Sequence, residues 1–275
     1  MPATRALCSF LDLNCIKFDF KEVNVFEESG LHANCNAGQP VLNKDGKSIL
    51  GDVSSLMRFV TMCKGLETTA GKPAVVSERA LDSSSRHLVD SYLEYVQNMV
   101  NRTSSRITKL VFQRLVYLRK PGEGDDIEMT LFDPATNNAQ IQEEAEIFYD
   151  TILENLQTHL VDKNGLTGLS DGAAEKLSAL VASGPTVGKS SNSKQQFFIS
   201  GDKSCSSVDL LMYSHIANTL QVLSLLNTQE KPVNLESAIA SKYPAVAVWM
   251  ETLQAMSQVQ KYQAVFESQY VKAME

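Results

Sequence analysis

Cysteine is the residue type here that could most readily act as a nucleophile or hold a metal, and its spacing restricts both roles. The chain has five cysteines, Cys8, Cys15, Cys35, Cys63 and Cys205, and no two of them form a Cys-x-x-Cys pair. Neither a zinc site nor a dithiol redox site is therefore indicated. We expect reduced, mostly buried thiols in a compartment that faces the cytosol.

The remaining residues that could do chemistry are isolated from one another. No group of His, Asp and Glu has the spacing of metal ligands, and we expect His215, inside an apolar stretch, to be a core histidine. The segment Gly184–Ser190 ends in Gly-Lys-Ser, but three residues separate its glycines where a phosphate loop has four. No strand precedes the segment, so we do not expect it to bind a phosphate.

Two acidic residues occupy the starts of predicted helices. Asp52 precedes an apolar run of helical period, and its carboxylate would accept hydrogen bonds from the first free N–H groups. Ser206 and Asp209 have the spacing of a capping box at the next such start. Asp52 could also hold the amine of a peptide-like ligand. We favour the structural role for Asp52, Ser206 and Asp209.

Composition excludes some classes of partner. Of 275 residues, 43% are hydrophobic and 21% charged, which allows a large core, and the formal net charge is −7. An acidic surface repels phosphate backbones, so we do not expect nucleic acid as a partner. The longest apolar stretch, Val208–Leu226, is interrupted by polar side chains and predicts a core helix. Membrane attachment would then go through partner proteins.

The chain divides by its patterns into a small α/β part and a longer helical part. Residues 1–66 predict a helix at 4–14, a strand at 16–21, a hairpin whose turn is Asn43–Lys47, and a helix after Asp52. Residues 67–81 resemble a linker, and 82–275 predict an all-helical domain with insertions near 120–138 and 165–195. Its helices are expected from about Asp82 to 118, at 139–160 and 208–226, after Pro244, and at 262–274.

This order of elements resembles the glutathione-transferase architecture. Short motifs that carry the resemblance are Gln39-Pro40-Val41-Leu42, Asp52 after a hairpin, Phe198–Lys203 followed by Ser206–Asp209, and Tyr243-Pro244 followed by Trp249. In that family the proline of the first motif is usually cis and precedes the third strand. The resemblance implies a thioredoxin-like domain followed by a larger helical one.

Two departures from the family argue against transferase activity. The first strand, which ends in the catalytic residue, would lie before the first helix, and the chain begins there at Met1. A serine usually follows the glutathione-binding acid, and Val53 stands in its place. The resemblance thus implies a degenerate glutathione site at Gln39, Pro40, Val41, Asp52 and Val53. Cys8, near the start of the first helix, is the weak candidate nucleophile, and we expect it to be packed in the core. Arg5 could lower the pKa of a thiol, but it equally suits a solvated helix start.

Within the superfamily the chain most resembles the metaxin family. The similar segments are Tyr92–Val100, Gly201–Asp209 and Ser214–Ala217. Metaxins are adaptor-like proteins on the cytosolic side of the mitochondrial outer membrane that assist the assembly of β-barrel proteins. The resemblance implies a non-catalytic subunit with protein partners and no cofactor or metal. The alternatives are an accessory subunit of a respiratory or synthetase-type complex, or a cytoplasmic glutathione transferase.

Overall fold

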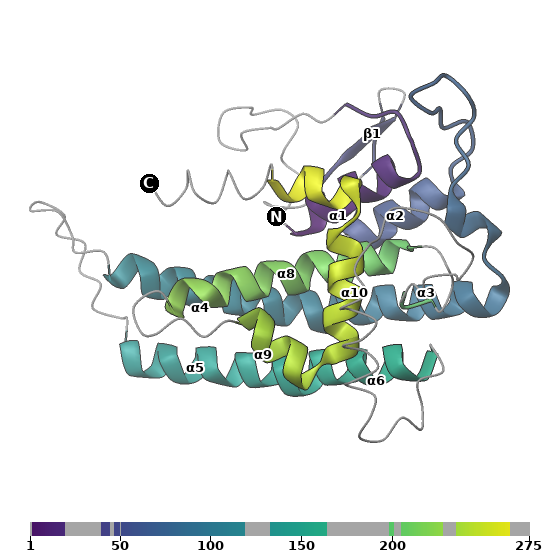
Figure 1. The fold of residues 1–275 in the computed structure, drawn as a ribbon. Helices are drawn as coiled ribbons and strands as arrows, with labels where there is room; N and C mark the ends of the chain where they lie inside the picture. Colours follow the sequence, from purple (N-terminus) through teal and green to yellow (C-terminus); the bar gives the residue numbers. More distant parts are fainter. Residues whose placement is uncertain are drawn as a thin grey trace, which may run out of the picture. The chain divides into compact units, whose positions relative to one another are not determined.

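The computed structural model describes residues 2–19, 40–44, 47–49, 51–118, 133–163, 198–200, 205–227 and 235–264. This part of the chain is mostly helical, and it includes one short antiparallel hairpin (Figure 1). It forms two compact units. Unit 1 comprises residues 1–94, 192–214 and 249–275, and unit 2 comprises residues 95–191 and 215–248. The division expected at 67–81 stays a prediction.

Unit 1 begins with helix α1, Pro2–Leu13, whose apolar side chains recur at helical spacing. Ala6, Leu7 and Phe10 are at most 3% exposed, so one face of the helix is core. The helix ends where Ile16 N–H donates to the Leu11 carbonyl and Cys15 N–H to the Asp12 carbonyl, each at 2.9 Å. Cys15 has φ 53°, the left-handed conformation that this type of helix end requires and that glycine usually supplies.

The hairpin pairs β1, Leu42–Lys44, with β2, Lys47–Ile49, so that Asn43 faces Ser48. The prediction of a strand at 16–21 is wrong for the described residues 16–19. Only Ile16 pairs with another segment, in a single bridge to Thr68. That partner lies in a tight loop which turns back on itself, with Glu67 bridged to Pro73 and Gly71 at φ 70°. A loop this short gives the segment no continuous partner strand.

Helix α2, Val53–Met62, packs against α1 and buries Val53, Leu56, Met57 and Val60. A turn of 3₁₀ helix, η1 (Ser77–Ala80), then leads to α3, Ser83–Tyr95. Asn14, beyond the end of α1, accepts hydrogen bonds from the Ser77 N–H at 3.0 Å and the Ser77 hydroxyl at 3.3 Å. These bonds fix the position of η1 against the end of α1.

Unit 2 is built on two long helical stretches, each containing π-helical turns. The first continues from α3 through η2 (Val96–Val100) into α4 (Asn101–Leu118). The second runs through α5 (Pro134–Glu146), η3 (Ile147–Leu153) and α6 (Glu154–Lys163). The two stretches contact each other through α4 and α5 and through η2 and η3 (Figure 1). Since Asp133 caps α5, the loop expected near 120–138 ends earlier than predicted.

The last third of the chain is helical where the structure describes it. Helix α8 covers Ser207–Asn227, α9 covers Leu235–Lys242 and α10 covers Pro244–Gln254. Residues 257–264 form a further helix that begins before the expected residue 262. Pro244 occupies the first position of α10, where its missing N–H costs no hydrogen bond. The insertion expected near 165–195 lies outside the described residues.

Replacing Cys15 by glycine is expected to raise the free energy of unfolding. Removing a side chain from a left-handed residue relieves about 1–2 kcal/mol of strain, and the added freedom of the unfolded chain offsets part of it. We expect a net gain of about 0.5–1 kcal/mol in urea unfolding. Cys63→Gly is the matched control, because Cys63 has φ −68°, and it should lose stability. Equal losses in both variants would contradict this account of Cys15.

Candidate functional site

The described residues of the expected glutathione site cap a helix, pack in the core or lead into a strand. Asp52 lies before α2 and accepts hydrogen bonds from Ser55 N–H at 2.8 Å and from the Ser55 hydroxyl at 3.1 Å, one on each carboxylate oxygen. Val53 is 4% exposed and packs in the core. Pro40 and Val41 lead into β1, and Val41 is 38% exposed. Gln39, with its peptide bond to Pro40, lies outside the described residues.

Cys8 is a core residue of α1 with 4% of its surface exposed. Burial raises the pKa of its thiol to about 11; the Asp12 carboxylate adds to the rise, and Lys261 opposes it. A nucleophilic thiolate needs the opposite environment, electropositive and open to substrate. Arg5 is also buried, so it is not a solvated residue at the helix start. Its guanidinium donates a hydrogen bond to the Ser214 carbonyl at 2.7 Å and lies over the Tyr213 ring. These two contacts compensate for the hydration that the guanidinium loses on burial.

A fully buried carboxylate, Asp209, stands at the start of α8. One oxygen accepts the N–H and the hydroxyl of Ser206, at 3.0 and 2.6 Å. The other accepts the Ile199 N–H at 2.8 Å and the Trp249 indole N–H at 2.9 Å. Asp209 thus joins the first turn of α8 to residues 198–200 and to Trp249 of α10, and these residues belong to unit 1. We refer to these four residues as the Asp209 network.

A second buried carboxylate, Glu78 of η1, lies near the same helix start. It accepts the Ser207 N–H on one oxygen and the Thr61 hydroxyl, at 3.3 Å, on the other. Burial raises the pKa of both Glu78 and Asp209, and their hydrogen bonds oppose that rise. Cys205 is 5% exposed, and burial, with smaller contributions from Asp209 and Glu78, raises the pKa of its thiol. Its thiol is therefore no better a nucleophile than that of Cys8.

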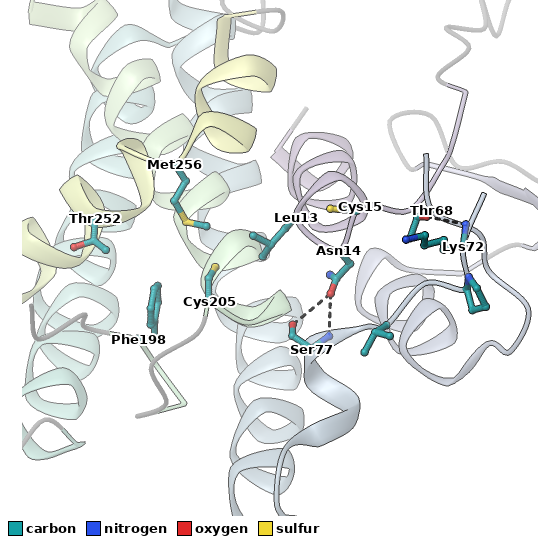
Figure 2. A pocket seen from close by; sticks show the side chains of 12 residues that line it. Leu13, Asn14, Cys15, Thr68, Lys72, Ser77, Phe198, Cys205, Thr252 and Met256 are labelled. Carbon is teal, nitrogen blue, oxygen red and sulfur yellow. Dashed lines mark hydrogen bonds between the residues drawn. The ribbon is translucent and has the colours of Figure 1, made fainter. Parts of the chain in front are cut away.

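The described part of unit 1 also contains a cavity of about 600 Å³. Leu13, Asn14 and Cys15 line its middle (Figure 2). Phe198, Cys205, Thr252 and Met256 lie toward one end, and Thr68 and Lys72 toward the other. Pro73, Val75 and Ser77 complete the lining.

The structure distributes the expected site residues between two regions of unit 1. Ser206 and Asp209 meet in the Asp209 network, whereas Asp52 serves only its own helix. The cavity was not expected from the sequence, because its walls come from segments more than a hundred residues apart. Cys15, in the middle of the lining, has a left-handed backbone conformation that no sequence motif predicts.

The described residues hold no group of three or more His, Cys, Asp or Glu side chains that could bind a metal ion. No helix within the same ranges is both long and apolar enough to cross a membrane. His215 is 4% exposed on α8.

Comparisons with protein-family models, with curated proteins and with solved structures found no match to this chain.

Because Glu78 is buried, we expect the stability of the protein to fall as this carboxyl group ionises. Its pKa is higher in the folded protein than in the unfolded chain, so its contribution to stability is complete below the unfolded pKa. That contribution is lost as the pH rises through the raised folded pKa. Glu78→Gln, which does not titrate, should therefore lose less stability than the wild type as the pH rises above about 4.

The measurement is urea unfolding at a series of pH values. Glu67→Gln, at an exposed position, is the matched control and should follow the wild-type curve. A Glu78→Gln curve parallel to the wild type over this range would show that burial does not govern this carboxyl group.

Proposed function

We propose that this chain is a non-catalytic binding subunit of a larger protein assembly. The main support for a non-catalytic role is the state of Cys8, the candidate nucleophile. Its thiol is buried, and its pKa is raised to about 11. At neutral pH that thiol is almost entirely protonated and closed to substrate. The acid expected to bind glutathione has both oxygens engaged by Ser55, and the valine after it offers no hydroxyl.

The resemblance to the metaxins gives the proposal its specific form. The expected assembly is one that handles β-barrel proteins at the mitochondrial outer membrane, on the side that faces the cytosol. The Ser206–Asp209 motif, part of that resemblance, is the centre of a hydrogen-bond network that orders residues 198–200 and α10. This network is our support for a glutathione-transferase-like helical domain, whereas the proposed thioredoxin-like domain depends on the resemblance alone.

Exposed apolar side chains offer a surface for such partners. Met62 at the end of α2 is 79% exposed and Val75 is 81% exposed, both in unit 1. Large apolar side chains this exposed contribute favourably when a partner covers them. Met99, in unit 2, is only 37% exposed, and we do not include it in the proposed contact.

The test is affinity purification of the tagged chain from fractionated cells in mild detergent, followed by mass spectrometry. We expect a fixed set of partner proteins, enriched in the mitochondrial fraction and including an outer-membrane β-barrel assembly component. Met62→Asp should reduce partner recovery about fivefold or more, because it places a charge in the contact. Met99→Asp is the matched control and should leave recovery unchanged.

Two results would contradict the proposal. Recovery of the chain alone from the cytosol would remove the assembly role. Conjugation of glutathione by the purified chain, lost on Cys8→Ala, would establish a transferase in its place. Recovery with a respiratory or synthetase-type complex would retain the subunit role and replace the outer-membrane assembly.

A further inference from the structure

The cavity of unit 1 has ends of different chemistry. Phe198 and Met256 give one end an apolar surface, and Lys72 lies toward the other (Figure 2). Leu13 lies between them and continues the apolar wall (Figure 2). The polar atoms of Asn14 in that wall are already used, because its amide donates to the Phe10 carbonyl and accepts from Ser77. The lining of the cavity is thus mainly apolar, with a charge toward one end.

That charge is the ammonium group of Lys72. No aspartate or glutamate is among the described residues that line the cavity, and no described residue forms an ion pair with Lys72. Its backbone is held in place, since Lys72 N–H donates to the Thr68 hydroxyl at 3.1 Å and Thr68 N–H donates to the Lys72 carbonyl at 2.7 Å. A cation beside an apolar surface favours a ligand with a single anionic group.

The volume of the cavity and the small number of hydrogen-bond donors in its lining limit the class of ligand that it could bind. A volume of about 600 Å³ is within the range of small-molecule sites. Phosphate groups usually bind to several converging N–H groups or to arginine, whereas the described lining supplies one lysine. We propose that this cavity binds an elongated apolar molecule with one carboxylate, of the fatty-acid class. The carboxylate pairs with Lys72, and the hydrocarbon chain lies along Leu13 toward Phe198 and Met256.

Cys15 provides a direct reporter of occupancy. It is exposed and lines the middle of the cavity, whereas Cys8 and Cys205 are buried. A ligand that fills the cavity must therefore cover the Cys15 thiol. Cys63 is part-exposed and does not line the cavity, so its reaction gives an internal standard.

The experiment measures the rate at which iodoacetamide alkylates each cysteine, using peptide mass spectrometry on the full chain. Dodecanoate, kept below its micelle concentration, should slow alkylation of Cys15 at least fivefold and leave Cys63 unchanged. Dodecanol, with the same hydrocarbon chain and no charge, should require a concentration about three- to fivefold higher for the same protection.

Two variants test the parts of the site. Lys72→Met, which keeps the apolar stem, should weaken protection by dodecanoate about three- to fivefold and abolish its advantage over dodecanol. Lys64→Met is the matched control at an exposed lysine outside the cavity lining. Met256→Trp should prevent protection by filling the apolar end, with circular dichroism to verify folding.

Absence of protection by dodecanoate in the wild type would overturn the proposal. Equal protection by dodecanol and dodecanoate, or an unchanged Lys72→Met, would overturn the role of the carboxylate. Equal slowing of Cys63 would identify non-specific binding of the fatty acid and would likewise overturn it.

Discussion

The buried carboxylate of Asp209 is the interaction on which the rest of unit 1 depends. Removing a carboxylate from water is costly unless hydrogen bonds replace its hydration, and Asp209 accepts four within 3.0 Å. Its donors come from three separate parts of the chain. Losing any one of them would leave a buried charge incompletely satisfied, so the carboxylate specifies the positions of all three.

The cavity follows from this constraint. Phe198 precedes Ile199, Cys205 precedes Ser206, and Thr252 and Met256 lie beyond Trp249 in the sequence. The residues at the apolar end of the cavity are therefore neighbours in sequence of the Asp209 donors. Glu78 acts similarly elsewhere, because its bond to Ser207 N–H holds η1, and with it Ser77, near the start of α8. The two buried carboxyl groups thus help to organise the cavity wall, and both contribute to the raised pKa of the Cys205 thiol.

Local patterns in the sequence were sufficient to predict a contact when the side chain interacts with its own helix. Asp52 and the Ser206–Asp209 pair follow from spacing alone, because capping contacts join residues three apart. The bonds from Asp209 to Ile199 and Trp249 do not follow from spacing, since they depend on how distant segments pack. The strand expected at 16–21 had the right period, but a strand also requires a partner, and Ile16 meets only a short loop. The mostly helical character was predictable from apolar periodicity, whereas the π-helical turns of η2 and η3 were not.

Amide and indole hydrogen exchange, measured by NMR on the wild-type protein, tests the role of Asp209 most directly. Ile199 lies outside any helix, and its N–H donates to Asp209, so protection at Ile199 reports on that bond. The account predicts that the Ile199 N–H and the Trp249 indole N–H exchange only when unit 1 unfolds globally. Exchange of Ile199 at the rate of an open loop, while the core of α8 stays protected, would contradict it.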